Sequence, residues 1–485
     1  MALRVYNTLS GKKEEFKPLH PPKVGMYACG VTVYDYCHIG HARAAVAFDV
    51  IARYLRFAGY DVTYVRNYTD IDDKIINRSN EQGVNWKDLA QTFIDAHDTD
   101  MGALGVQRAD VEPRATDYID QIIGIVKTLE NKGMAYEMDG DVYFEVEKFD
   151  GYGKLSKRNI EEMQAGARID VDERKRNPLD FALWKSSKQG EPAWESPWGK
   201  GRPGWHIECS AMSAAILGQP LDIHGGGKDL IFPHHENEIA QSEAAGGKEF
   251  VRYWMHNGFV NIDSEKMSKS LGNFFTIREV LEKYRPEVVR FFLLSTHYRS
   301  PLDFSDRALT EAETRYERFM HLFARIHRMI AEERDMDEAE SASADLLSHK
   351  IEPRFREAMD DDFNTAAAIG HLFTALGSLN GVLDGADSQS RGISTGWKEA
   401  VDRFFRRIGN VLGFFEDGFS EGENWFAAGA GDNTGETKAR ALALERVDAR
   451  KNKDWGKADE LRNAIAELGY DVQDTPQGPV LIPRK

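Results

Sequence analysis

The sequence predicts an α/β protein, in which a parallel-sheet domain carries an α+β insertion and is followed by a helical bundle and a small C-terminal domain. Three observations lead to this fold class. A strand–helix–strand pattern runs from residue 24 to 65, an alternating strand lies at 141–146, and apolar residues recur at helical spacing after about residue 305. Their order along the 485 residues places the sheet first, the insertion within it and the bundle after it.

The first half of the sheet is predicted from residues 24–65. Residues 24–29 form a short apolar strand, and 62–65 form a second one. Between them, residues 41–59 carry apolar side chains on one helical face, namely Ala45, Phe48, Ile51, Ala52 and Leu55. A strand, a helix and a strand begin a Rossmann-like parallel sheet, in which ligands bind beyond the carboxyl ends of the strands. The sheet is expected to resume at 221–224.

Composition changes define the predicted domains. Residues 1–305 form the catalytic domain, with the insertion at about 110–200, and residues 306–426 form a helical bundle built on three apolar stripes. The small and polar stretch 427–437 is a linker. Residues 438–485 are then enough for one small helical domain that ends in a tail punctuated by Gly and Pro.

The overall composition is that of an ordinary soluble protein, with 41% hydrophobic and 29% charged residues. No signal peptide or membrane helix is expected from the pattern. Three scattered cysteines are too few for a disulfide framework, which indicates a reducing, cytoplasmic setting. The net charge of −17 argues against a globally basic nucleic-acid-binding protein, but residues 438–485 carry ten Lys and Arg against eight Asp and Glu. On charge alone, this segment is either a surface where RNA binds or an ordinary solvated surface.

Two short motifs carry the predicted chemistry. The first box, residues 38–41 (HIGH), falls at a strand-to-helix turn, where backbone N–H groups and the helix dipole favour phosphate. Gly40 there allows close approach of a nucleotide. The second box, residues 266–270 (KMSKS), offers two lysines and two hydroxyls as a clamp for pyrophosphate, and Lys269 is expected to lie closest to ATP, supported by Lys266. Alone, each box is more often an ordinary turn or a solvated loop.

A second constellation has the residue types of a zinc site. Cys29 ends the first strand, Cys209 follows the segment 204–208, and His234 and Glu238 stand at i and i+4, on one face of a helix. Two Cys, one His and one Glu are chemically suitable ligands for zinc. Scattered cysteines are more often inert core residues, and Cys37 is interpreted in that way.

The two boxes, in this order and more than 200 residues apart, resemble the ATP-handling motifs of class I aminoacyl-tRNA synthetases. The remaining motifs are similar to those of the cysteinyl-tRNA synthetase family, and the resemblance spans essentially the whole chain. These motifs are CGVTVYD at 29–35, NYTDIDDK at 67–74, GWHIECS at 204–210, FPHHENE at 232–238, MDDDFNT at 359–365 and DTPQG at 474–478.

The resemblance implies a function and a set of site residues. Cysteine and Mg-ATP would give cysteinyl-adenylate and pyrophosphate, and the cysteinyl group would then pass to the 3′ end of tRNA(Cys). Of the first box, His38, Gly40 and His41 would bind ATP, and the two histidines would act with Lys266 and Lys269 in catalysis. One zinc ion would be held by Cys29, Cys209, His234 and Glu238, with the substrate thiolate as a further ligand. Trp205 and Thr69 would line the cysteine pocket, and Asp229 would receive the substrate ammonium.

The zinc ion would solve a problem of selectivity. Serine differs from cysteine by one atom, and shape alone rejects such an isostere by only about 10²-fold. A soft thiolate binds zinc far better than a hydroxyl does. The family accordingly has no editing domain, and the sequence has no spare domain for one.

The tail departs from the family pattern, because the tryptophan usual after its terminal glycine is missing and residues 479–482 are Pro, Val, Leu and Ile. Arg450, Lys453 and Trp455 are therefore the candidates for tRNA contact, and Trp455 could equally be a core residue. The family expectation is a monomer, without a membrane partner.

Two other readings are open at this point. The first is a relative that joins cysteine to an amino sugar without tRNA and shares the boxes and similar zinc ligands. Such enzymes match only the catalytic part of this sequence, so the predicted bundle and C-terminal domain argue against this reading. An inactive, RNA-binding paralogue is disfavoured by the presence of both boxes and all four ligands. A methionine-specific enzyme of the same class would carry CxxC zinc knuckles, which the sequence lacks.

Overall fold

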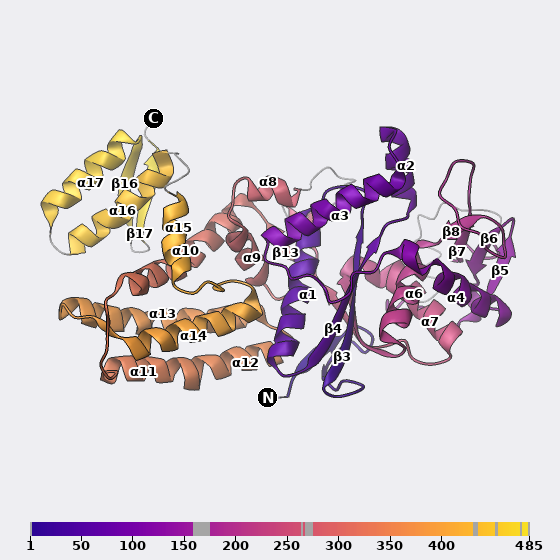
Figure 1. Ribbon diagram of the computed structural model, residues 1–485, viewed down its shortest axis with the longest axis horizontal. Coiled ribbons are helices and arrows are strands. Elements are labelled where there is room, and N and C mark those ends of the chain that lie inside the picture. Colours follow the sequence, from indigo (N-terminus) through magenta and orange to yellow (C-terminus); the bar gives the residue numbers. More distant parts are fainter. Residues whose placement is uncertain are drawn as a thin grey trace. The chain divides into compact units, whose positions relative to one another are not determined.

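A computed structural model of the chain describes residues 2–158, 175–262, 265–266, 275–429, 435–451, 454–475 and 478–483. The chain divides into two compact units. Unit 1 comprises residues 1–314, 349–374 and 409–414, and unit 2 comprises residues 315–348, 375–408 and 415–485. The helices and strands of the whole chain are drawn in Figure 1.

The centre of unit 1 is a four-stranded parallel sheet in the order β10-β9-β3-β4. Its strands are β3 (Lys23–Thr32), β4 (Asp61–Thr69), β9 (Leu221–Gly227) and β10 (Val251–Asn257). The predicted parallel sheet is thus confirmed, and β3 is longer than the six residues expected. Because β3 pairs with β4 on one side and with β9 on the other, the strand order reverses at β3, which is where open α/β sheets bind ligands.

Helices cover both faces of this sheet. Helix α1 (Ile39–Phe57) packs against β9 so closely that a Cβ on Gly225 would lie 2.2 Å from the Phe48 ring. On the other face, α6 (Trp205–Leu217) and α7 (Glu236–Gly246) enclose a core that includes Tyr27, Met212 and Ile239, each fully buried. Buried sheets of this kind need apolar strands on both faces, which explains the near-continuous apolar run in β3.

The insertion into unit 1 is a small α+β layer. Its antiparallel sheet has the order β5-β6-β7-β8, and α4 (Ile119–Asn131) packs with it around buried residues such as Val126, Phe144 and Trp184. The strands are β5 (Ala135–Met138), β6 (Asp141–Phe144), β7 (Phe181–Ser186) and β8 (Gly201–Pro203). The strand expected at 141–146 is β6.

The other elements of unit 1 frame the sheet. The elements before the insertion are β1 (Arg4–Asn7), β2 (Lys12–Glu15), α2 (Asp73–Gln82), α3 (Trp86–Ala103) and η1 (Ala115–Tyr118), and η2 (Val146–Lys148) lies within it. Those after it are η3 (Lys228–Leu230), η4 (Ile231–His235), β11 (Val260–Ile262), β12 (Glu265–Lys266), α8 (Ile277–Leu281), α9 (Pro286–Leu294), β13 (Leu302–Phe304) and α12 (Glu352–Asp360).

A buried ion network ties α1 to α9 within unit 1. The Asp49 carboxylate on α1 accepts hydrogen bonds from Arg53 and from Arg290 of α9. Arg43, also on α1, donates to the backbone carbonyls of Leu293, Thr296 and His297 at the end of α9. Because all three arginines are at most 7% exposed, this packing holds the first-box helix firmly against the segment that follows the second box.

Helices dominate the rest of the chain, as the apolar stripes predicted. They are α10 (Asp306–Arg328), α11 (Glu338–Leu346), η6 (Leu347–Ile351), α13 (Thr365–Ser388), α14 (Thr395–Leu412), α15 (Ser420–Gly429), α16 (Gly435–Lys451) and α17 (Trp455–Glu467). Two short strands, β14 (Ala331–Glu332) and β15 (Ile393–Ser394), pair in parallel. Among the helices of the described ranges, α13 alone is long and apolar enough to cross a membrane by length and composition, and a core helix of a soluble protein passes the same test.

The C-terminal end differs from the prediction of a small helical domain with an irregular tail. The tail is an antiparallel β-hairpin of β16 (Tyr470–Thr475) and β17 (Gly478–Pro483), and it packs against α16 and α17 around Ala439 and Ile465. The alternating Val480 and Ile482 were the sequence signal for β17. The predicted linker at 427–437 overlaps the end of α15 and the start of α16, and residues 430–434 lie outside the described ranges.

Candidate functional site

A β-bulge at the end of β3 positions the first cysteine of the site. Between the pairs Ala28–Arg66 and Val31–Tyr68, β3 contains one residue more than β4, so the strand bulges at Cys29 and Gly30. Only glycine fits at position 30, because a Cβ there would lie 1.6 Å from the Asn67 carbonyl oxygen. The bulge therefore directs Cys29 away from the regular pleat of the strand, at the switch point of the sheet.

The four predicted ligands meet at this point. The Cys29 sulfur lies 3.7 Å from the Cys209 sulfur, 3.6 Å from Nε2 of His234 and 3.5 Å from Oε1 of Glu238. His234 Nε2 and Glu238 Oε1 are 3.0 Å apart. A tetrahedral zinc ion with bonds of 2.0–2.3 Å requires ligand atoms about 3.3–3.8 Å from one another. The cluster thus has the donor atoms and the size to hold such an ion.

A layer of histidines beneath this cluster was missed in the sequence. His224 and His235 are fully buried, with their Nε2 atoms 3.5 and 3.3 Å from the Cys29 sulfur. His235 also shares a hydrogen bond of 2.8 Å with His256, which in turn contacts Thr8 Oγ1 at 2.8 Å. Both His224 and His256 lie on strands, where a single polar residue leaves no periodic signal.

The electrostatics of the cluster shifts the pKa values of the two cysteine thiols in opposite directions. The hydrogen bond that the Cys29 thiol donates lowers the pKa of Cys209 to about 6. Burial, together with the charge on Cys209, raises the pKa of Cys29. One thiolate is therefore present at neutral pH, and a metal ion that binds here has to displace only one further thiol proton.

The histidines in and around the cluster also have pKa values shifted in opposite directions. Burial opposes protonation of His234, but the Glu238 carboxylate and Cys209 outweigh it and raise the pKa of His234 to about 10. Burial lowers the pKa of His235, and it lowers that of His256 to about 3. His235 and His256 are thus neutral at physiological pH, the form in which imidazole can orient a ligand, whereas a metal ion would have to displace the proton of His234.

The first box caps helix α1 with its own side chains. Nδ1 of His38 accepts a hydrogen bond from the Gly40 backbone, and Nδ1 of His41 accepts one from the His38 backbone, each at 3.1 Å. The two rings stack with their centroids 3.8 Å apart. Because each Nδ1 is an acceptor, the neutral rings carry their proton on Nε2, which is then a hydrogen-bond donor. The helix N-terminus and these two donors make a suitable site for phosphate.

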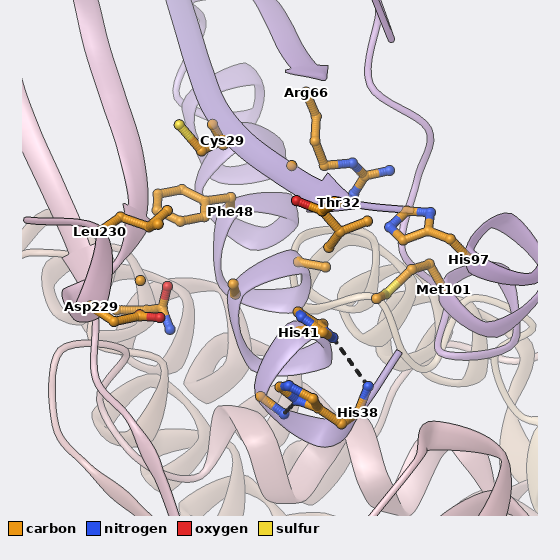
Figure 2. A pocket seen from close by; sticks show the side chains of 18 of the residues that line it. Cys29, Thr32, His38, His41, Phe48, Arg66, His97, Met101, Asp229 and Leu230 are labelled. Carbon is orange, nitrogen blue, oxygen red and sulfur yellow. Dashed lines mark hydrogen bonds between the residues drawn. The ribbon is translucent and has the colours of Figure 1, made fainter. Parts of the chain in front are cut away.

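Cys29, from the cluster, and His38, Gly40 and His41, from the first box, line one cavity of about 380 Å³. Figure 2 shows Cys29 at the top of this cavity, His38 and His41 at its base and Asp229 on the opposite wall from His97. A cavity of this size is within the range that small-molecule sites occupy. An amino acid near the cysteines and a nucleotide near the histidines would therefore share one space.

Of the three residues expected in the cysteine pocket, two line the cavity and the third is buried away from it. Trp205 lines the cavity, is 38% exposed and lies with its ring centroid 4.3 Å from that of His234. Asp229 also lines the cavity. Thr69 is 2% exposed and donates a 3.0 Å hydrogen bond to Glu208 instead, and it is not among the described residues that line the cavity.

The second box falls largely outside the described residues. Of its members, the backbone of Lys266 is described in β12, which pairs with β11, whereas Lys269 lies in the undescribed segment 267–274. Of the tRNA candidates, Lys453 lies outside the described residues and Arg450 is partly buried on α16. Trp455 is 59% exposed at the start of α17, which argues against a core role.

Comparison with known proteins supports one family. A family model described as the class I tRNA synthetase (C) catalytic domain matches residues 15–314, a DALR domain matches 354–416 and a cysteinyl-tRNA ligase anticodon binding domain matches 436–478. The cysteine–tRNA ligase of Geobacter metallireducens is 59% identical, and that of Trichlorobacter lovleyi is 56% identical, each over 99% of both chains.

Solved structures agree on the fold. Methionyl-tRNA synthetase of Mycobacterium tuberculosis bound to methionyl-adenylate has a TM-score of 0.59 at 17% identity, covering 85% of this chain and 94% of that one. A leucyl-tRNA synthetase complex of Agrobacterium radiobacter has a TM-score of 0.56 at 12% identity, covering 82% and 85%. With full-length relatives above 50% identity and these domain matches, the chain belongs to the cysteine–tRNA ligases, a family of class I aminoacyl-tRNA synthetases.

Proposed function

We propose that this ligase activates L-cysteine with Mg-ATP and transfers the cysteinyl group to the 3′ end of tRNA(Cys), with a zinc ion that selects the substrate thiolate. The observation that carries the proposal is the single cavity bounded by Cys29 and by the first box. Cys29, Cys209, His234 and Glu238 would hold the ion, which supplies a soft Lewis acid that binds a thiolate in preference to a hydroxyl.

The remaining side chains position the two substrates for adenylate formation. Asp229 would pair with the cysteine ammonium, Trp205 would close the pocket over the side chain, and Thr69 would fix the wall through Glu208. The cysteine carboxylate attacks the α-phosphate of ATP, and pyrophosphate leaves. This step depends mainly on positioning and on stabilisation of charge at the transferring phosphoryl group.

The two boxes would bind the ATP phosphates. The Nε2–H groups of His38 and His41 are directed by their Nδ1 hydrogen bonds, and Gly40 allows close approach of the nucleotide. Lys269, supported by Lys266, would bind the pyrophosphate as it leaves. These four side chains are the proposed catalytic residues.

Transfer to tRNA would require the C-terminal part of the chain. We assign residues 1–305 to catalysis, 306–426 to a helical bundle that binds tRNA, and 438–485, after the linker at 427–437, to anticodon recognition. Arg450, Lys453 and Trp455 are the proposed RNA contacts, because Trp455 is an exposed aromatic ring and lies close in sequence to two basic residues, a combination that suits unpaired bases. The three free cysteines suit a cytoplasmic enzyme, which we propose to be a monomer.

The test is amino-acid-dependent exchange of pyrophosphate into ATP. Exchange is expected with cysteine and not with serine, it should stop when the protein is stripped of metal, and added zinc should restore it. Cysteine exchange that survives complete removal of metal, or equal exchange with serine, would contradict the role of zinc. Metal analysis of the purified protein should give one zinc ion per chain.

A further inference from the structure

The segment that leaves the second box is joined to the first box by its backbone. Ile277 N donates to the Cys37 carbonyl at 2.9 Å, and Ile39 N donates to the Phe275 carbonyl at 3.2 Å. His38 and Thr276 form an isolated antiparallel bridge between these bonds. Residues 275–277 therefore extend the first-box segment like a short partner strand, immediately before α8.

Arg278 links this junction to helix α3 and to the segment just before the first box. Arg278 Nε donates a 2.8 Å hydrogen bond to Oδ1 of Asp100 on α3, and Asp100 is only 3% exposed. The Arg278 guanidinium also lies 4.4 Å from the centroid of the Tyr36 ring, two residues before the first box. Arg278 thus contacts the first-box segment and the cavity-lining helix α3 at once, since His97 and Met101 of α3 line the cavity.

The local structure fixes Arg278 in this position. Thr276 Oγ1 caps α8 by accepting from the Glu279 backbone N–H, and the Glu279 carboxylate accepts from the Thr276 backbone N–H, so both sides of Arg278 are held in a capping box. At the other end of the second box, Lys266 pairs with Asn261 of β11. Both points at which the chain enters and leaves the second box are therefore anchored within unit 1.

We propose that Arg278 is a positioning residue for ATP, which sets the exit of the second box against the first box through Asp100 and Tyr36. The proposal rests on the proposed function of the two boxes as ATP-binding elements. Arg278 itself need not touch ATP. A planar guanidinium suits the role, because it can stack on an aromatic ring and donate to a carboxylate at the same time.

The test compares four variants in cysteine-dependent pyrophosphate exchange. Arg278→Ala is expected to raise the KM for ATP about tenfold and to change the KM for cysteine less than twofold. Arg278→Lys keeps a cation near Asp100 but loses the planar stacking on Tyr36, so it is expected to raise the KM for ATP about three- to fivefold, less than Arg278→Ala does. Asp100→Asn, which preserves size, should raise the KM for ATP about fivefold. The double variant Arg278→Ala, Asp100→Asn should be no worse than Arg278→Ala, because the two groups act as one unit.

The matched control is Arg307→Ala, which removes an arginine from an exposed pair with Glu311 on α10 and should leave both KM values unchanged. Equilibrium dialysis of ATP is the second measurement, and Arg278→Ala should weaken ATP binding by the same factor. This binding assay separates the two proposals, because it does not depend on which amino acid is activated. An ATP KM within twofold of the Arg307 control, or equal rises in the KM values for ATP and cysteine, would overturn the positioning role.

Discussion

Asp49 is a buried charged residue whose replacement should destabilise unit 1 strongly. Its side chain is 2% exposed and accepts hydrogen bonds from Arg53 Nε, from the Gln107 backbone and from Arg290 Nη2. Arg290 is 1% exposed and Arg53 is 7% exposed. One buried carboxylate therefore pairs with two buried guanidinium groups, whose remaining N–H groups donate to backbone carbonyls such as those of Asn410 and Leu412.

The change Asp49→Asn keeps the size of the side chain and removes its charge. Removing one partner from a buried ion pair typically costs about 3–5 kcal/mol, because the remaining charge is left without compensation. In addition, the new NH₂ group is a donor that faces another donor. For a unit of more than 250 residues, this loss corresponds to a fall in melting temperature of roughly 5–10 °C.

The measurement is thermal unfolding followed by calorimetry, with the free energy of unfolding from urea titration as a second value. Asp61→Asn is the control, because Asp61 is exposed at the start of β4 and should change the melting temperature by less than about 1 °C. A fall of less than about 2 °C for Asp49→Asn would show that water compensates the two arginines, and the argument from burial would then be wrong.

Three further outcomes are expected. The Glu340 side chain is fully buried and bonded to Arg334, which helps to lower its pKa from 4.5 to about 2 against the opposing effect of burial. A depressed carboxyl pKa stabilises the fold above pH 4.5 and loses this contribution as the pH falls toward 2, so Glu340→Gln should cost about 3 kcal/mol at pH 7 and progressively less in melts at pH 4 and pH 3. A pH-independent difference would contradict this assignment. His206→Ala removes the ring whose Nδ1 lies 3.0 Å from Nδ1 of His234, and it should weaken zinc binding about 10- to 100-fold in competition with a chromophoric chelator. Unchanged affinity would mean that His234 needs no such support. Ending the chain after residue 430 should leave pyrophosphate exchange intact and reduce tRNA charging by at least about tenfold. Full charging by the shortened chain would rule out a role of residues 431–485 in tRNA recognition.

Much of the fold followed from local patterns. The strand–helix–strand start and the apolar stripes of the bundle are periodic, and periodicity reports which face of an element is buried. The C-terminal hairpin was missed because its second strand is short and begins with Gly478 and Pro479, which are residues typical of a turn.

The site was only partly predictable. Cys29 and Glu238 are 209 residues apart, so residue type could suggest them as ligands of one ion, and the resemblance to a family was needed to define the full set. The bulge at Gly30 and the buried His224 could not be foreseen, because they depend on how β3 meets β4 and β9 in space. Arg278 escaped notice for the same reason, since an arginine on a short helix is ordinary until Asp100 and Tyr36 are brought beside it.

The position of β3 between β4 and β9 also determines the order in which the sheet can form during translation. Cys29 leaves the ribosome long before Glu238, with 209 residues between them. At about 5–20 residues per second, this delay is roughly 10–40 s. During most of that interval β3 can pair with β4 but not with β9. One edge of β3 is therefore unpaired, and Cys29 lacks the cluster residues that come later in the chain. The nascent chain therefore has to protect an open strand edge and a reactive thiol until its second half emerges.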